Sequence, residues 1–291
     1  MKPAPFEYSR PATLDQACAL LAADDGARII AGGQTLVPMM AMRLSRPTRI
    51  VDIGRIAELA YVRDEGDFVI IGATTRQCVV ESDPVVATKL PLLAKAVPFV
   101  GHAPTRARGT VGGSLANADP AAEIALVAVT FDATLCYREG TRDAEMAAAD
   151  FFTGAMTTAL PPGACLTAVR FPVWNEDRLG VGFHEVNARR SDFAFVSAAA
   201  QVALDRDGTC RRLVLGIGAA TEIPIRLQAA ERALVGTRLD EASVRAAIEE
   251  ALREIETLAD LHASAEYRQR VAATLAVRAL ADAQMQAAHA H

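Results

Sequence analysis

The sequence contains few cysteines, and none of them is spaced as a metal ligand would be. The five cysteines are scattered along the 291 residues, at positions 18, 78, 136, 165 and 210. Structural zinc sites and iron–sulfur clusters need closely spaced ligands such as CxxC, so we expect neither in this chain. Scattered cysteines in an odd number predict reduced thiols, and therefore a cytoplasmic protein.

Long hydrophobic runs and an excess of positive charge are also missing. No run approaches the ~20 apolar residues of a membrane span, and the start MKPAPFEYS lacks the apolar stretch of a secretory signal. The net charge of −5 argues against a nucleic-acid partner. With 51% hydrophobic and 22% charged residues, the chain can build a sizeable core, in one large domain or two to three smaller ones.

The motifs of the common nucleotide-binding and hydrolytic enzymes are missing too. There is no GxxxxGK[ST] and no GxSxG, and GIGAAT and GVGFHE lack the third glycine of a dinucleotide fingerprint. The histidines, at positions 102, 184, 262, 289 and 291, form no pair with the helical spacing of metal ligands. We therefore expect no metal site, and we assign no catalytic residue.

Residues 1–56 have the pattern of a small α/β unit. In ATLDQACALLAADDG, Thr13 and Gln16 fit a capping box ahead of apolar residues with helical spacing. A short apolar strand, a helix over residues 36–44 and a strand over residues 48–53 follow. This order predicts a first subdomain that ends at about residue 56.

Residues 57–176 predict a second α/β subdomain. A strand over residues 67–75 precedes helical stretches that break at Asp83-Pro84. A later helix is expected to start with Asp119 as its cap and Pro120 at its first position. A hairpin that turns at Glu139-Gly140 and a strand over residues 165–173 complete the unit.

The pattern changes near residue 176, where we place the second boundary. Two strands and a turn at Asp207-Gly208 lead into a third strand, and the rest is helical: roughly residues 226–235, 240–256 and 265–286. Residues 177–291 thus predict an α+β domain with a three-stranded antiparallel sheet and helices.

Two glycine pairs interrupt these units, in IIAGGQTL (residues 29–36) and TVGGS (residues 110–114), and we expect both at strand ends. Glycine has no Cβ, so it allows positive φ angles and lets a ligand touch the main chain. Successive N–H groups in such turns converge on anions, and the nearby hydroxyls add donors. Two such turns predict a pyrophosphate held from both sides by aligned dipoles. The alternative is that each pair forms only a tight turn.

Four stretches together resemble the flavoprotein subunit of molybdenum hydroxylases: IIAGGQTLVPMM, VGHAPTRARGTVGGSLANADPAAE, VNARRSDFAFVSAAAQV and SAEYRQRVAATLAVRAL. The resemblance covers essentially the whole chain, and it is to the medium subunit of carbon monoxide dehydrogenase-like enzymes and the FAD domain of xanthine dehydrogenase. It implies a PCMH-type, vanillyl-alcohol oxidase-like FAD-binding fold. Two α/β subdomains (1–56 and 57–176) would enclose FAD, and a C-terminal α+β domain (177–291) would cover it.

The resemblance also implies which residues bind FAD. It places the pyrophosphate and adjacent ribityl chain along both glycine segments, with Glu123 at an acidic FAD-binding position. Leu166 and His184 match positions at the flavin end in xanthine dehydrogenase, where the equivalent of His184 is commonly lysine. Val100 falls where some relatives place an aromatic residue against the ring. The implied set is Ile29, Ile30, Ala31, Gly32, Gly33, Gln34, Thr35, Leu36, Val100, Thr110, Val111, Gly112, Gly113, Ser114, Asn117, Asp119, Glu123, Leu166 and His184.

Three of these residues have a purely structural interpretation as well. Glu123 sits in the first turn of a predicted helix, where the helix dipole favours a carboxylate without any ligand. In the structural interpretation Asp119 caps the predicted helix, and capping alone explains an aspartate at this position. A strand histidine such as His184 is more often packed or at the surface than a ligand.

The resemblance implies an oxidoreductase subunit that carries electrons rather than performing the substrate chemistry. In this family a large subunit with a molybdopterin cofactor oxidises the substrate, and a small subunit with two [2Fe–2S] clusters relays electrons to FAD. FAD then passes them to an external acceptor, and the complex is expected to be an (αβγ)2 assembly. The alternatives are a self-contained FAD-dependent reductase and a non-catalytic scaffold subunit with a decayed FAD site. The intact glycine pairs argue against the scaffold.

Overall fold

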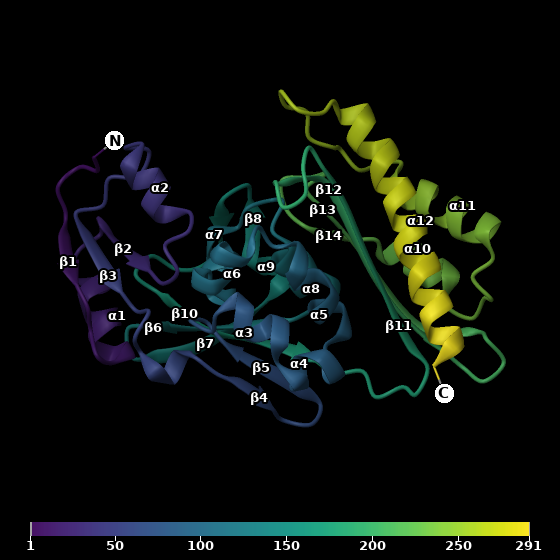
Figure 1. Ribbon diagram of the computed structural model, residues 1–291, viewed down its shortest axis with the longest axis horizontal. Helices are drawn as coiled ribbons and strands as arrows, with labels where there is room; N and C mark the ends of the chain where they lie inside the picture. Colours follow the sequence, from purple (N-terminus) through teal and green to yellow (C-terminus); the bar gives the residue numbers. More distant parts are fainter. Residues whose placement is uncertain (1, 291) are drawn as a thin grey trace.

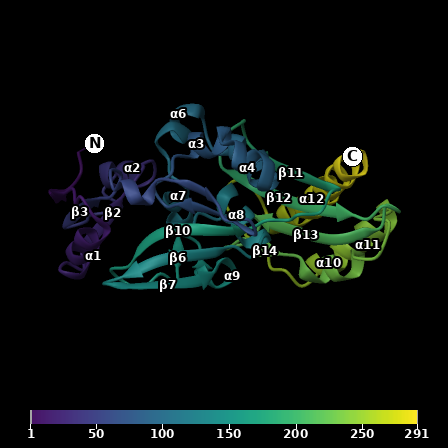
Figure 2. The ribbon, with the colours of Figure 1, turned by 90° about the horizontal axis from the view of Figure 1, so that it is seen from below.

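The computed structural model describes residues 2–290, which form three main sheets placed side by side along the long axis of the molecule (Figure 1). The N-terminal sheet lies at one end, and the C-terminal sheet with its helices lies at the other (Figures 1 and 2). The predicted boundaries after residues 56 and 176 fall in the connections between sheets, and the three-domain division at those residues stays a prediction.

The N-terminal sheet is parallel, with the strand order β1-β3-β2. Its elements are β1 (Glu7–Ser9), α1 (Leu14–Ala22), β2 (Ala27–Ile30), α2 (Leu36–Ala41) and β3 (Arg49–Asp52). Thr13 caps α1 as predicted, because its hydroxyl accepts the N–H of Gln16 at 3.3 Å. The Gln16 side chain accepts from Ala12 rather than from Thr13. Strand β1 was not predicted, because three residues carry no periodic pattern and pairing with β3 alone defines the strand.

The central sheet is antiparallel, with the order β4-β5-β10-β6-β7, and helices α4 and α7 pack on it (Figure 1). The predicted helix break is confirmed, since Asp83 ends α3 and caps α4. The hairpin at Gly140 is confirmed as well, with a φ of +59°.

The strands are β4 (Val62–Asp64), β5 (Phe68–Gly72), β6 (Thr134–Glu139), β7 (Arg142–Ala147) and β10 (Cys165–Pro172), with the small pair β8 (Phe152–Gly154) and β9 (Thr157–Thr158). The helical elements are η1 (Ala57–Leu59), α3 (Gln77–Ser82), α4 (Pro84–Lys89), α5 (Pro91–Ala96), η2 (Val97–Phe99), α6 (Ala103–Arg108), α7 (Val111–Asn117), α8 (Glu123–Thr130) and α9 (Ala148–Phe151).

Two predictions in the central unit are wrong. The second glycine pair does not end a strand: Gly112 and Gly113 lie in the first turn of α7, which Thr110 caps by accepting the N–H of Gly113 at 3.0 Å. Asp119 does not cap α8, whose N-cap is Ala122. The Pro120 carbonyl accepts the N–H of Ala219 at 2.8 Å, so a contact with the C-terminal unit occupies it before the helix begins.

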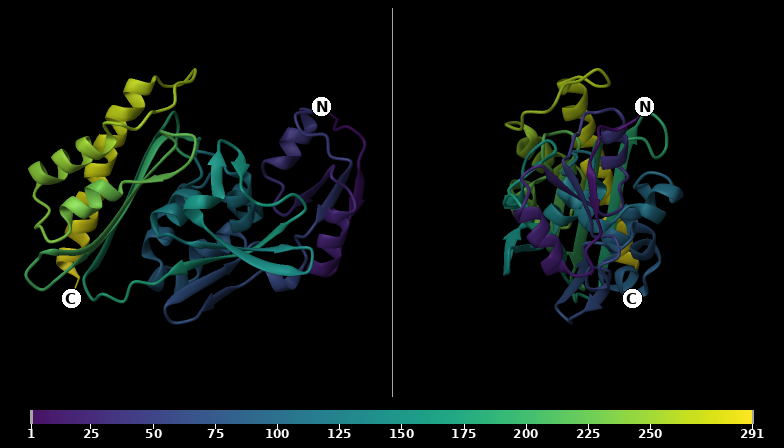
Figure 3. Two further views of the ribbon diagram at one scale, coloured as in Figure 1. Left: turned by 180° about the vertical axis from the view of Figure 1, so that it is seen from behind. Right: turned by 90° about the vertical axis from the view of Figure 1, so that its left-hand side faces the viewer.

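The C-terminal sheet is antiparallel, with the order β11-β12-β13-β14, and helix α12 lies along β11 and β12 (Figures 1 and 3). The three long predicted strands and three helices are confirmed, and the two-residue β14 adds a fourth strand. The strands are β11 (Leu179–Asn187), β12 (Ala194–Leu204), β13 (Cys210–Gly218) and β14 (Ile225–Arg226), and the helices are α10 (Gln228–Leu234), α11 (Glu241–Leu252) and α12 (Ala265–His289).

Helix α8 joins the central and C-terminal units. All of its residues are buried, because it packs against α5 and α7 on one side and β12 and β13 on the other. A Cβ on Gly216 of β13 would overlap the Thr130 hydroxyl, so glycine permits this close approach. Glu123, the first residue of α8, is thereby held between the two units. Within residues 2–290, every helix is too short or too polar to cross a membrane.

Candidate functional site

A cavity of about 690 Å³ lies where the three units meet. The β2–α2 turn, the segment between η2 and α8, the start of β10 and the loop between β11 and β12 all contribute to it. This volume is typical of cofactor pockets. Most of the predicted cofactor-binding residues line it: Ile29, Ile30, Ala31, Gly32, Gly33, Gln34, Thr35, Leu36, Val100, Thr110, Gly112, Gly113, Ser114, Asn117, Asp119, Glu123 and Leu166.

The structure places the other two predicted residues elsewhere. Val111 is fully buried in the core of the central unit. His184 lies on the face of β11 that meets α12, with its Nε2 atom 2.9 Å from Asp282 Oδ2. The alternation of side chains along a strand decides this, because the neighbouring Phe183 faces the opposite way and packs against Phe99.

The first glycine segment forms a turn with unused donors. Gly33 has a φ of +70°, which only glycine adopts without strain. The N–H groups of Gly32, Gly33 and Gln34 have no hydrogen-bond acceptor within residues 2–290. A Cβ on Gly32 would lie 2.5 Å from the carbonyl oxygen of Arg108, so the turn packs tightly on the residues just before the second segment. The first segment can therefore donate several backbone hydrogen bonds to an anion.

The second glycine segment uses its donors internally. The N–H groups of Val111 and Gly112 donate to the carbonyls of Thr75 (3.0 Å) and Ala73 (2.8 Å). Those of Gly113 and Ser114 donate to Thr110, at 3.0 Å to its hydroxyl and 3.1 Å to its carbonyl. The N–H groups of this segment are thus already paired within residues 2–290, and its binding of the pyrophosphate stays a prediction. Its glycines serve packing, since a Cβ on Gly112 would lie 2.5 Å from that of Ala73.

Few charged groups line the cavity, and the acids outnumber the cations. Arg28 and His102 are the basic residues that line it, against Asp119, Glu123 and Asp192. The Arg28 guanidinium donates to the backbone carbonyls of Ala27 and Asp25, just before it in the chain, at 2.7 and 2.9 Å. A bound phosphate would therefore be held chiefly by backbone dipoles.

Glu123 is the most strongly perturbed acid of the cavity. It is 9% exposed, and burial raises the pKa of its carboxyl from 4.5 to about 7. Burial also raises the pKa of Asp119. Burial, followed by the charge of Glu123, raises the pKa of Glu185 on β11 to about 8. Near neutral pH, Glu123 can thus donate or accept a hydrogen bond at the cavity wall.

Two family models cover nearly the whole chain. Residues 4–174 match the FAD binding domain in molybdopterin dehydrogenase, and residues 182–283 match the CO dehydrogenase flavoprotein C-terminal domain. The chain belongs to the FAD-binding subunits of the molybdopterin dehydrogenase family. It is therefore an oxidoreductase subunit with an FAD-binding domain.

Known relatives of this flavoprotein match over nearly their full length. The alpha subunit of the 6-hydroxypseudooxynicotine dehydrogenase complex of Paenarthrobacter nicotinovorans is 34% identical, covering 97% of this chain and 96% of the relative. The beta subunit of caffeine dehydrogenase of Pseudomonas sp. (strain CBB1) is 37% identical, with the same coverage. The structure of reconstituted CO dehydrogenase from Oligotropha carboxidovorans matches with a TM-score of 0.95 and 31% identity, over 98% of this chain and 100% of that chain.

Several residues that line the flavoprotein's cavity were not predicted from the sequence. Phe193 carried one usable signal, as a large apolar residue in a polar loop, and it is 75% exposed beside the cavity. Many of the others lie inside the stretches that carry the resemblance but had no role assigned to them, and tertiary contacts bring the rest to the wall. The missed residues are Arg28, Met39, Ile53, Ala73, Gln77, Gly101, His102, Thr105, Gly109, Ala116, Ala121, Ala122, Met156, Leu160, Cys165, Ser191, Asp192 and Phe193.

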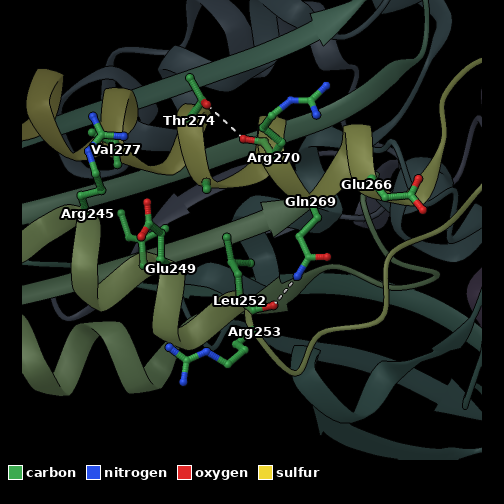
Figure 4. A pocket seen from close by; sticks show the side chains of 11 residues that line it. Arg245, Glu249, Leu252, Arg253, Glu266, Gln269, Arg270, Thr274 and Val277 are labelled. Carbon is green, nitrogen blue, oxygen red and sulfur yellow. Dashed lines mark hydrogen bonds between the residues drawn. The ribbon is translucent and has the colours of Figure 1, made fainter.

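A second cavity, of about 510 Å³, lies on the C-terminal domain between α11 and α12 (Figure 4). Its wall mixes three arginines, Arg245, Arg253 and Arg270, with Glu249 and Glu266. None of the predicted cofactor-binding residues lines it. Across residues 2–290, no group of three or more His, Cys, Asp or Glu side chains is arranged to hold a metal ion.

Proposed function

We propose that this flavoprotein binds FAD in the 690 Å³ cavity and passes electrons from the [2Fe–2S] clusters of a small partner subunit to an external acceptor. The observation that carries the proposal is the β2–α2 turn, where three unused N–H groups and a positive-φ glycine line a cavity of cofactor size. Membership of an FAD-binding family supports FAD as the occupant.

When bound, FAD supplies the exchange between two-electron and one-electron chemistry. The chain's own residues would bind and orient it. The N–H groups of Gly32, Gly33 and Gln34 would hold the pyrophosphate, which needs donors rather than a single cation. Leu36, Leu166 and Val100 provide apolar wall that keeps water from the cofactor, and Glu123 offers a carboxyl that can donate or accept a hydrogen bond.

We place the flavoprotein in a cytoplasmic (αβγ)2 complex with that small subunit and a large subunit that carries the molybdopterin cofactor. The names of its relatives, which are subunits of dehydrogenase complexes, support this assembly. Exposed apolar side chains also support it: Val37 on α2, Met42 and Leu44 just after this helix, and Phe193 at the cavity. Contiguous exposed apolar surface marks protein–protein contacts, whereas single exposed apolar residues are common on any protein.

The first test is to purify the full chain, record its visible spectrum and quantify any cofactor that denaturation releases. We expect FAD at about one per chain in the wild type, and its loss in Gly33→Val. The matched control is Gly140→Val, because Gly140 also has a positive φ, of +59°, but lies at an open hairpin turn with no neighbour within 4 Å. A folded wild-type chain that stays colourless with added FAD would refute the proposal in favour of a scaffold subunit.

A further inference from the structure

Three consecutive residues of the cavity wall, Val100, Gly101 and His102, connect η2 to α6, and we call them the wall loop. Gly101 has a φ of +47°, a conformation that favours glycine. The N–H groups of Gly101 and His102 have no hydrogen-bond acceptor within residues 2–290. The wall loop therefore has two unused backbone donors, in addition to those of the first glycine segment.

The guanidinium of Arg106, on α6, holds the wall loop from the side away from the cavity. Its Nη1 atom donates to the carbonyl oxygens of Val100 at 3.1 Å and of Gly101 at 3.0 Å. The three residues of the wall loop line the cavity and Arg106 does not, so the loop lies between the guanidinium and the cavity. A single side chain thus fixes two successive peptide groups.

These contacts set the direction in which the two N–H groups point. The peptide bonds of the wall loop are trans, so the C=O and N–H of each planar peptide group point in opposite directions. Because both carbonyls point toward Arg106, the N–H groups of Gly101 and His102 point away from it, to the cavity side of the loop. There they can donate to an acceptor on a ligand.

Glu81, on α3, fixes the guanidinium in turn. Its two carboxylate oxygens accept from Arg106 Nε at 2.7 Å and from Arg106 Nη2 at 2.9 Å. This bidentate pair sets the plane of the guanidinium and leaves Nη1 for the carbonyls of the wall loop. The Arg106 side chain is only 12% exposed, so water screens the pair less than it would at the surface.

We propose that Arg106, held by Glu81, is a positioning residue for the cofactor. It fixes the wall loop so that the N–H groups of Gly101 and His102 donate to hydrogen-bond acceptors of bound FAD. The pyrophosphate oxygens and the polar edge of the flavin ring both supply such acceptors. The inference rests on the proposed FAD function, and it extends the use of oriented backbone donors from the β2–α2 turn to a second segment of the wall.

The test measures the dissociation constant for FAD by fluorescence titration of full-chain variants freed of cofactor. The titration is done at a temperature at which circular dichroism shows each variant to be fully folded. Arg106→Lys keeps the charge, but an ammonium group cannot hold both oxygens of Glu81 and both carbonyls of the loop. We expect the dissociation constant to rise about tenfold in Arg106→Lys, and by up to about a hundredfold in Arg106→Gln.

Glu81→Gln tests the second half of the pair. An amide offers one acceptor oxygen instead of two, so the guanidinium loses its bidentate partner and we expect FAD to bind more weakly. Combining Glu81→Gln with Arg106→Gln should weaken binding no further than Arg106→Gln alone, because both residues act through the same loop. Additive losses in the double variant would overturn the inference.

Arg178→Lys is the matched control. Arg178 also donates to backbone carbonyls, among them those of Asp205 at 2.7 Å and Ala287 at 3.3 Å, but it does not line the cavity or contact the wall loop. We expect this variant to lower the Tm of the cofactor-free chain, as Arg106→Lys does, and to keep the wild-type affinity for FAD. The comparison separates positioning from a general loss of stability.

Competition by ADP separates the two sources of acceptors, because ADP contains the pyrophosphate and lacks the flavin ring. If the dissociation constant for ADP rises in Arg106→Lys as much as that for FAD, the wall loop donates to the pyrophosphate. If the ADP value stays at that of the wild type while the FAD value rises, the wall loop donates to the flavin ring. Both results support a positioning role for Arg106.

Two further outcomes would overturn the inference and leave the proposed function intact. Wild-type FAD affinity in Arg106→Lys would show that the fork of the guanidinium does not position the loop for the ligand. An equal loss of FAD affinity in Arg178→Lys would show that affinity follows the stability of the fold. A wild-type chain that binds no FAD would instead refute the proposed function, and this inference with it.

Discussion

At Glu123, burial and the helix dipole act in opposite directions. The carboxylate sits in the first turn of α8, where the dipole favours the ionised form. It is also packed between the central and C-terminal units, and burial favours the neutral form. The pKa of about 7 shows that burial has the larger effect. The sequence alone could suggest an acid here, but not its protonation state.

The carboxyl of Glu123 should make the free energy of unfolding depend on pH. Because its folded pKa of about 7 lies above its ordinary value of 4.5, its full contribution to stability is present below pH 4.5 and is lost as the pH rises through 7. We expect Glu123→Gln to match the wild type at pH 4.5 and to be more stable at pH 8, by at most roughly 3 kcal/mol. Urea unfolding of the cofactor-free chain at both pH values measures this.

The control for this prediction is Glu249→Gln, at an exposed glutamate of α11, which should leave the pH dependence unchanged. Glu185 titrates in a similar range and is coupled to Glu123, so Glu123→Gln should remove part of the dependence rather than all of it. An equal stability difference between Glu123→Gln and wild type at the two pH values would contradict the assignment.

At the scale of elements, the two glycine pairs show that similar residues can serve different structures. One pair forms a turn after β2 with free donors, and the other starts α7 with its donors occupied. Local sequence does not separate the two cases. What separates them is the run of residues 73–77, which supplies acceptors to residues 111 and 112 and has no counterpart beside the first pair.

The close contact between β11 and α12 also depends on glycine, because two glycines of β11 leave room for the α12 backbone. A Cβ on Gly180 or Gly182 would overlap the carbonyl oxygen of Ala283 or Ala279. The alanines that α12 buries, including Ala276, let the helix lie close to the strand.

We expect Gly182→Ala to lower the free energy of unfolding by about 1–3 kcal/mol or more, because the helix must move away from the sheet. Thermal unfolding followed by circular dichroism measures the loss. Gly154→Ala is the control, since the nearest atoms to its Cβ would be at 3.8 and 3.9 Å, an ordinary contact distance. Equal melting temperatures in the two variants would show that α12 does not pack closely on β11.

At the scale of the whole molecule, residues from all three units, each built around one sheet, line the cavity. A site built in this way forms only when the units are assembled, so binding of a cofactor should stabilise their arrangement as a whole. The exposed Phe193 lies in the loop that brings the C-terminal unit to the cavity.

The proposed division of labour predicts what the isolated chain can and cannot do. We expect the purified flavoprotein, loaded with FAD, to transfer electrons to a dye from a chemical reductant but to show no turnover of the substrate of its complex. Steady-state assays on the isolated chain and on the co-expressed three-subunit complex make the comparison. Full substrate activity in the isolated chain would refute the division.

The sequence by itself determined the features that depend on neighbouring residues. These are the cap at Thr13, the helix break at Asp83, the hairpin at Gly140 and the long C-terminal helices, because backbone preference and periodicity act over a few residues. It also indicated about half of the cavity wall, 17 of its 35 residues, since the glycine segments carry the family resemblance. Only the tertiary structure decided that His184 faces α12, that the first glycine segment keeps its donors free, that Arg106 holds the wall loop and that Glu123 has a raised pKa. Each of these depends on burial or on partners distant in the chain, which local sequence does not encode.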